Sequence, residues 1–149
     1  MGNMSDHRAE RARERLASFM AAQGKKNTRQ REVIVDVFLA AHGHHTITEL
    51  LEMAKERDPR VGYATVYRTM KMLTEARVAL ERHFGADQTR YELLELGEHH
   101  DHLICTSCHC IIEYEDPIIE ERQLEIAARY GFEIRSHRHE IYGTCKECQ

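Results

Sequence analysis

Residues 62–78 read GYATVYRTMKMLTEARV, and the spacing of the apolar side chains in this stretch predicts an amphipathic helix. Val66, Met70 and Leu73 recur on one stripe, which a hydrophobic core can bury. A second stripe follows the i, i+3, i+4, i+7 pattern and combines small, aromatic and basic residues, so it can face a partner. Its members are Ala64, Tyr67, Arg68 and Lys71.

Upstream of this helix, capping signals and apolar spacing predict three more helices. The first covers about residues 6–22, and the second begins after Thr28, a residue type that satisfies the free amides of a helix N-terminus. Thr46 and Glu49 have the spacing of a capping box at the start of a third helix. That helix ends near residues 58–59, where a proline interrupts the pattern.

Downstream, residues 78–84 (VALERHF) and 89–96 (TRYELLEL) flank the sequence GADQ, a pattern typical of a β-hairpin with a glycine-containing loop. The last three helices and this hairpin together predict a winged helix-turn-helix. Arg68 and Lys71 would then meet DNA phosphates or bases, and Tyr67 would meet a sugar or a thymine methyl group. The alternative is a solvated amphipathic helix without a partner.

All five cysteines lie between Cys105 and Cys148, and four of them form two CxxC pairs. Each pair can present two thiolates to one tetrahedral ion, so the two pairs together predict a closed structural zinc site. Its expected ligands are Cys105, Cys108, Cys145 and Cys148. A thioredoxin-like redox pair or a set of unrelated buried thiols is the alternative. Cys110 is interpreted as a spare thiol.

The tetrad His99-His100-Asp101-His102 directly precedes the first CxxC pair. Side chains alternate between the two faces of an extended strand, so His100 and His102 would share one face, and His99 and Asp101 the other. The tetrad would thus contribute to two separate metal sites. A solvated polar loop is the alternative interpretation.

Between the CxxC pairs, residues 110–115 (CIIEYE) predict a strand, and Asp116 followed by Pro117 is typical of a helix N-terminus. This helix would end at Gly131, and residues 132–143 (FEIRSHRHEIYG) would return as a further strand. The apolar stripe of the helix needs a cover, and a second subunit is the most economical one for so small a domain. The stripe consists of Ile119, Ile126, Ala127 and Tyr130.

The two parts of the chain differ in charge and in potential metal ligands. Residues 1–96 carry a net charge of +2, whereas residues 97–149 carry a net charge of −6, six of the eleven histidines and every cysteine. We therefore expect an α+β chain with two domains. A winged-helix DNA-binding domain would cover residues 1–96, and a small α/β domain for metal binding and dimerisation would cover residues 97–149.

No apolar run approaches the roughly 18 residues that a membrane helix needs, and residues 1–16 lack the apolar stretch of a secretion signal. We therefore expect a cytoplasmic protein without a membrane partner, with reduced thiols rather than disulfides. A His/Asp/Glu metal centre could also belong to a hydrolase, but the chain has no HExxH motif and no HxE motif followed by PCxxC. Neither turnover nor a small-molecule substrate is expected.

Taken in order, these motifs resemble those of the ferric uptake regulator family. The resemblance rests on GYATVYR in the recognition helix, on HHDHLICTSC around the first CxxC pair, and on YGTC at the second. It covers the chain from about Gly24 to Cys148. It implies a homodimeric transcription regulator of the cytoplasm that binds palindromic operator DNA when loaded with metal.

The resemblance also implies roles for individual residues. The four cysteines of the CxxC pairs match the ligands of a structural Zn²⁺ ion. A regulatory metal site that joins the two domains is matched by His45, Glu92, His100, His102 and Glu113. A further metal site in the dimerisation domain is matched by His99, Asp101, Glu120 and His137. Four histidines match no required position and are interpreted as surface residues: His42, His44, His109 and His139.

For DNA binding, Lys26 matches a position that reaches into the minor groove. Tyr67 and Arg68 match the base and phosphate contacts of the recognition helix, and Lys71 lies on the same predicted face. Metal that fills the regulatory site would set the distance between the two recognition helices of a homodimer, so that both fit successive major-groove half-sites of double-stranded DNA.

Mixed imidazole and carboxylate ligation without a thiolate favours Fe²⁺ as the regulatory metal, with Mn²⁺, Co²⁺ or Zn²⁺ as substitutes by affinity. Zinc-responsive members of the family tend to place a cysteine in the regulatory site, and peroxide-sensing members tend to use Asp where this chain has Glu92 and Glu113. This chain differs from both of these groups, which favours an iron-loaded repressor of iron uptake genes. A zinc- or peroxide-responsive regulator of the same family is the alternative.

Overall fold

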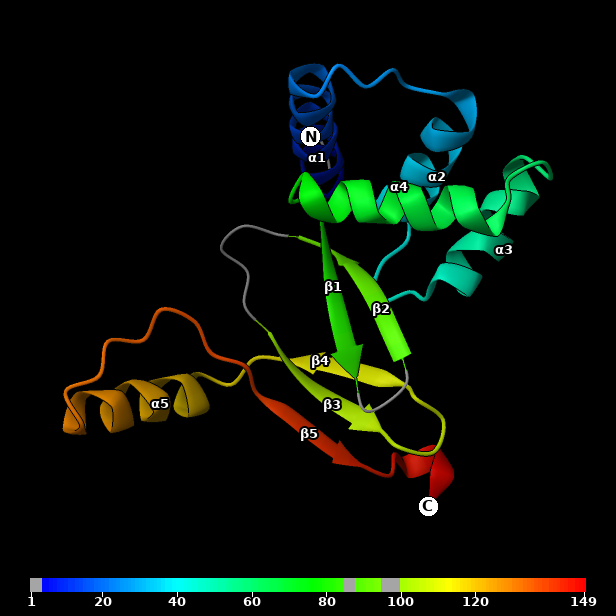
Figure 1. The fold of residues 1–149 in the computed structure, drawn as a ribbon. Coiled ribbons are helices and arrows are strands. Elements are labelled where there is room, and N and C mark those ends of the chain that lie inside the picture. Colours follow the sequence, from blue (N-terminus) through cyan, green and yellow to red (C-terminus); the bar gives the residue numbers. More distant parts are fainter. Residues whose placement is uncertain (1–3, 85–87, 95–99) are drawn as a thin grey trace. The chain divides into compact units, whose positions relative to one another are not determined.

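The computed structural model describes residues 4–84, 88–94 and 100–149. The chain divides into two compact units, Met1–Leu96 and Gly97–Gln149, which we call the N-terminal unit and the C-terminal unit. The N-terminal unit contains the helices α1 to α4 and a two-stranded sheet, and the C-terminal unit contains a three-stranded sheet and one long helix (Figure 1).

Two of the four N-terminal helices, α2 and α3, begin where the capping signals place them. The side chain of Thr28 accepts a hydrogen bond from the Arg31 amide. Thr46 and Glu49 form the complete capping box, with each side chain bonded to the backbone of the other residue. The helices are α1 (Met4–Ala22), α2 (Arg29–Ala40), α3 (Ile47–Arg57) and α4 (Tyr63–Glu75). These caps confirm the predicted starts of α2 and α3.

A hairpin follows α4, as the sequence predicts. Strand β1 (Ala79–Phe84) pairs antiparallel with β2 (Gln88–Leu93), and the two strands lie side by side in Figure 1. Most of the GADQ loop lies outside the described residues. Helices α2 to α4 and this hairpin form the winged helix-turn-helix arrangement, and with the mixed sheet of the C-terminal unit they confirm the predicted α+β class.

The two stripes of α4 have different surroundings. Val66, Met70 and Leu73 are fully buried in the core that the N-terminal helices share. On the other stripe Tyr67 and Arg68 are exposed. The helix thus keeps one face in the core and offers the other to solvent, as its periodicity predicts.

The C-terminal unit is built on a mixed sheet with the strand order β4-β3-β5. Strand β3 (Asp101–Cys105) lies in the centre, antiparallel to β4 (Ile111–Tyr114) and parallel to β5 (Glu140–Gly143). Helix α5 (Pro117–Arg129) connects β4 to β5, and the Asp116 side chain caps it by accepting from the amides of Ile118 and Ile119. A single 3-10 turn, Lys146–Cys148, follows β5.

The strand predicted over residues 132–143 is wrong in its length, since only Glu140–Gly143 is a strand. Its register gives the reason. The four residues of β5 pair with His102–Cys105, and β3 has only five residues to offer. The His139 carbonyl still accepts from the His102 amide at 3.2 Å, and the residues before it run outside the sheet.

Helix α5 is amphipathic in sequence but covers little in this chain. None of its thirteen residues, all of which the structure describes, is buried. Ile118 is 76% exposed, and Tyr130, which follows the helix, is 79% exposed. The predicted need for a cover therefore remains. Among the described residues, no helix has both the length and the apolar character to cross a bilayer.

Candidate metal centres and nucleic-acid interface

Four thiols gather at one end of the C-terminal sheet. The Sγ atoms of Cys105, Cys108, Cys110 and Cys145 all lie within 4.8 Å of one another. Cys108 Sγ is 3.7 Å from Cys145 Sγ, and the amides of Cys108 and Cys145 donate to Cys105 Sγ at 3.5 and 3.3 Å. These amide hydrogen bonds lower the pKa of Cys105 to about 5, so this thiol is ready to bind metal as a thiolate.

The chemistry of this cluster fits a tetrahedral zinc ion, because zinc prefers thiolates and its structural sites take four ligands. Three of the four predicted ligands, Cys105, Cys108 and Cys145, belong to the cluster. The fourth, Cys148, is its neighbour, since hydrogen bonds with Cys145 and Cys108 raise the pKa of its thiol to about 12. Cys110, interpreted from the sequence as a spare thiol, also lies inside the cluster.

A second set of ligand groups lies on the same sheet and contains no thiol. His102 on β3 is directly opposite Glu113 on β4. His100 lies just before β3, and its Nε2 is 3.5 Å from Glu113 Oε1. The ring centroids of His100 and His102 are 5.3 Å apart, and one ligand atom from each of the three residues fits within 4.8 Å. Two imidazoles and one carboxylate form a ligand set that suits ferrous iron.

The N-terminal unit holds its own histidine and carboxylate pair. His44 Nε2 lies 2.5 Å from Glu92 Oε2, and only 4% of the His44 side chain is exposed. Arg82 Nε donates to Glu92 Oε1 at 2.7 Å. The interpretation of His44 as a surface histidine is therefore wrong.

In the structure His44, and not the predicted His45, lies beside Glu92. His45 forms an isolated antiparallel bridge with Tyr91, and its Nε2 donates to the carbonyl of His42 at 3.0 Å. Residues directly opposite in such a bridge share a face, and their chain neighbours point to the other face. His44 and Glu92 therefore meet on the face that His45 and Tyr91 do not occupy.

A third set of ligand groups lies within the C-terminal unit. One ligand atom each from Asp101, Glu120 and His137 lies within 4.8 Å of the others, and His137 Nε2 is 3.2 Å from Glu120 Oε1. The predicted fourth member, His99, lies outside the described residues. His139 is also more than a surface residue, because its Nδ1 lies 3.3 Å from Asp101 Oδ2.

The two C-terminal carboxylate and imidazole sets divide as strand alternation predicts. His100 and His102 join Glu113, whereas Asp101, between them in the sequence, joins Glu120 and His137. Neighbouring residues of an extended chain point to opposite faces, so one short segment supplies two separate groups of ligands.

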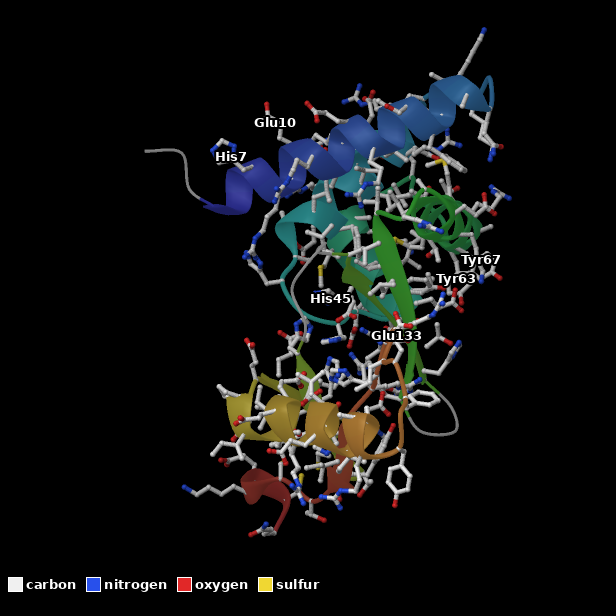
Figure 2. All side chains as sticks on the ribbon, turned by 90° about the vertical axis from the view of Figure 1, so that its left-hand side faces the viewer. His7, Glu10, His45, Tyr63, Tyr67 and Glu133 are labelled. Atoms are coloured by element: carbon white, nitrogen blue, oxygen red, sulfur yellow. The ribbon has the colours of Figure 1, made fainter. Side chains whose placement is uncertain are left out.

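The solvent face of α4 is suited to contact DNA. Tyr63 and Tyr67 are both exposed and project from the same side of the helix (Figure 2). Arg68 is exposed beside them, and Lys26 is exposed in the segment before α2. The ammonium group of Lys71 is 2.9 Å from Glu81 Oε2, so its charge is already balanced within the unit.

A shallow basic hollow lies beside this face, where the N-terminal ends of α2 and α4 meet. Four arginines line it together with threonine hydroxyls and a glutamine. Helix N-termini and guanidinium groups both favour phosphate oxygens, so the hollow suits one phosphate of a DNA backbone. The arginines are Arg29, Arg31, Arg60 and Arg68.

Glu92 makes the stability of the metal-free protein sensitive to acid. Burial by itself raises the pKa of Glu92, but the hydrogen bonds from His44 and Arg82 outweigh burial and lower this pKa from 4.5 to about 2. A carboxyl whose pKa is lower in the folded state stabilises the fold above pH 4.5 and loses this contribution as the pH falls toward 2. We expect Glu92 to contribute about 3 kcal/mol at neutral pH through this linkage.

Urea unfolding of the metal-free chain at several pH values measures this contribution. The difference in the free energy of unfolding between the native chain and Glu92→Gln should decrease by about 2 kcal/mol as the pH is lowered from 5 to 2.5. The exposed Glu52, replaced in Glu52→Gln, is the matched control and should show a constant gap. A constant gap for Glu92→Gln as well would contradict the assignment of its low pKa to the His44 and Arg82 contacts.

Taken together, these features define a class of protein: a winged-helix DNA-binding fold that carries a thiol cluster and separate imidazole and carboxylate sites for metal. Comparison with known proteins narrows this class. The sequence profile of the ferric uptake regulator family matches residues 22–142. The ferric uptake regulation protein of Campylobacter jejuni is 40% identical over 137 residues, which cover 91% of this chain and 87% of that protein.

Solved structures agree with this match. The Helicobacter pylori ferric uptake regulator, whose structure has three functional metal-binding sites, superimposes with a TM-score of 0.86 and 34% identity. The superposition covers 95% of this chain and 93% of that one. A zinc-bound manganese uptake regulator is also 34% identical, with a TM-score of 0.73 over 87% of this chain and 98% of that one.

The chain belongs to the ferric uptake regulator family. It is accordingly a metal-dependent transcription regulator and not an enzyme. The comparisons include regulators of both iron and manganese uptake, so they establish the class of regulator but not the metal to which this chain responds.

Proposed function

We propose that this protein is an iron-responsive repressor that binds palindromic operator DNA as a homodimer when Fe²⁺ fills its regulatory site. The observation that carries the proposal is the thiol-free set of His100, His102 and Glu113, which lies on the same sheet as the thiol cluster but separate from it. Thiolates select zinc, whereas two imidazoles with a carboxylate suit ferrous iron. The chain thus offers one ligand set for a structural ion and another for an exchangeable one.

The regulatory site draws on both units in this proposal. The N-terminal unit contributes a pair of ligands and the C-terminal unit contributes three. The proposed ligands are His44, Glu92, His100, His102 and Glu113. An ion that takes ligands from both sets restricts the orientation of the winged helix within its subunit, and this orientation sets the spacing of the two recognition helices in a dimer. The additional set of Asp101, Glu120 and His137, with His99 as its predicted fourth member, serves as a further metal site.

The proposed DNA contacts come from the N-terminal unit. Tyr67 and Arg68 read the major groove from α4, and Lys26 contacts the minor groove from the segment before α2. Lys71 is the weakest of the predicted contacts, because its ion pair with Glu81 competes with DNA phosphates. The exposure of Tyr67, Arg68 and Lys26 supports these assignments.

The proposed homodimer explains the apolar surface of the C-terminal unit. Leu103 on β3 pairs directly with Ile112 on β4 and with Ile141 on β5, so the three side chains form a row across one face of the sheet. They are 36%, 52% and 47% exposed, respectively. A second copy can bury this row, and the exposed apolar side chains of α5 offer it further apolar area.

Replacing one residue of this row by a charged one tests the dimer. Ile112→Glu should shift the protein from dimer to monomer in sedimentation experiments, because a carboxylate buried at a subunit interface lacks a partner. Thr48→Glu adds the same charge to an exposed position of α3 and should leave the dimer intact. If Ile112→Glu remains a dimer at the same concentration, the sheet row does not form the interface.

The proposed function itself is tested by DNA binding under controlled metal supply. An operator is first selected from a random pool of DNA duplexes with iron-loaded protein, and its affinity is then measured without oxygen in the presence of Fe²⁺ or EDTA. A coupling of about 1–3 kcal/mol between metal and DNA should raise the affinity roughly 5- to 150-fold with iron. Equal affinities with Fe²⁺ and EDTA would contradict the proposal. Activation by Zn²⁺ or Mn²⁺ at concentrations where Fe²⁺ fails would identify a different regulatory metal.

A further inference from the structure

The thiol cluster includes Cys110, whose backbone is paired with that of Cys105. The register of β3 and β4 pairs Ile104 with Ile111, and the next pair beyond it is Cys105 with Cys110. The Cys105 amide donates to the Cys110 carbonyl at 3.0 Å, so the antiparallel pairing continues to this point. Side chains that are directly opposite in such a pair share a face, with Cβ atoms about 4.5–5.5 Å apart.

The turn between these two cysteines is closed by a second constraint. His109 has a φ of 61°, a left-handed conformation that non-glycine residues adopt uncommonly, and its amide donates to the Cys105 carbonyl at 3.0 Å. This reversal returns the chain so that Cys110 meets Cys105 only two residues after Cys108. The backbone pairing therefore brings Cys110 next to Cys105.

Cys148 also contacts the cluster, because its thiol hydrogen-bonds with those of Cys145, Cys108 and Cys105, but its backbone lies in a short turn and not in the sheet. Its amide donates to the Cys145 carbonyl at 3.0 Å within the three-residue 3-10 turn, and the residue is exposed, as Cys110 is. The four Sγ atoms that share one 4.8 Å cluster include that of Cys110 and not that of Cys148. Two thiols thus compete for the position beside Cys105, Cys108 and Cys145.

We propose that Cys110 is a zinc ligand and that Cys110 and Cys148 are interchangeable in the fourth coordination position. A structural zinc ion takes four ligands, and this chain supplies five thiols for them. The ligand from the hairpin is positioned by the sheet, and the ligand from the 3-10 turn replaces it when it is lost. The site should therefore tolerate the loss of either thiol but not of both.

Serine variants of the full-length chain separate the two thiols, because serine keeps the size of cysteine but is a poor zinc ligand. Cys110→Ser and Cys148→Ser should each retain one zinc ion per chain after dialysis against a competing chelator. Cobalt-substituted forms of both should show the thiolate charge-transfer intensity of a four-thiolate site. The affinity of the double variant for zinc should be lower by a factor on the order of 100 or more. Loss of a residue that only hydrogen-bonds to a ligand already costs about 10- to 100-fold, and loss of a ligand should cost at least as much.

The decisive comparison is between Cys148→Ser and the double variant. If Cys148→Ser alone gives the three-thiolate cobalt spectrum and the weak zinc binding expected of the double variant, Cys110 does not coordinate the ion and the proposal is overturned. Cys110→Ala checks that the result for Cys110→Ser does not depend on the serine hydroxyl, and it should also retain zinc. All of these measurements are independent of DNA binding and of the regulatory metal.

Discussion

Replacing Cys105 by serine should empty the zinc site and unfold most of the C-terminal unit. Cys105 is the centre of the thiol cluster, since its Sγ accepts the amide hydrogen bonds of Cys108 and Cys145. We expect that neither Cys110 nor Cys148 can replace it. The Cys105 sulfur also accepts the amide of Cys145, which lies after β5, and so links that segment to the hairpin. The expected loss of folding stability is the largest of any single substitution considered for this protein.

The size of the effect follows from how little core the C-terminal unit has. Among its described residues, the hydrophobic side chains that are buried are Ile104 and Cys105. Zinc binding supplies folding free energy to small domains of this kind, about 10–16 kcal/mol in zinc-finger peptides at neutral pH. Loss of the ion should therefore cost several kcal/mol, more than so small an apolar core can offset.

Three measurements check this expectation: zinc content, the urea midpoint, and the oligomeric state of Cys105→Ser. Ser107→Ala, between the two cysteines of the first CxxC pair, is the matched control and should keep both zinc and the dimer. A Cys105→Ser protein with one zinc ion per chain and an unchanged urea midpoint would show that the thiol cluster does not hold the structural ion.

The second large effect is expected from Glu113→Ala, which should abolish the response of DNA binding to metal. Glu113 supplies the only carboxylate of the C-terminal regulatory set, opposite His102 and 3.5 Å from His100. Its side chain is partly exposed, so its removal should cost little folding stability. The 5- to 150-fold gain in operator affinity with Fe²⁺ should fall to within about twofold of the metal-free value.

The exposed Glu115, two residues further along the chain, provides the control. Glu115→Ala removes the same charge and should keep the full response to Fe²⁺. Both variants should retain zinc and the dimer. If Glu113→Ala responds to Fe²⁺ as strongly as the native chain, the carboxylate is a solvated strand residue and the regulatory site has other ligands.

The helical part of the fold could be predicted from the sequence because its signals are local. The Thr28 cap, the Thr46 capping box and the buried stripe of α4 depend on residues within one or two turns of helix. The CxxC pairs are equally local, since the chemistry of each pair is contained in four residues. These predictions needed no knowledge of which strands become neighbours.

The placements in the candidate sites that the sequence did not predict all depend on strand pairing. His44 and His45 are adjacent in sequence, and only the bridge between His45 and Tyr91 decides which of them faces Glu92. A shift of one residue turns every side chain of an extended segment to the other face. Cys110 escaped prediction for the same reason, since its place in the cluster follows from its position opposite Cys105 in the hairpin.

The sequence alone determined the kind of protein, because caps, helical periodicity and CxxC pairs act over a few residues and specify a winged helix and a thiolate zinc site. Only the tertiary structure decided which histidine meets Glu92, which thiols share the cluster and where β5 begins. These features depend on contacts between segments up to about 50 residues apart, and such contacts are determined by register and packing rather than by local preference.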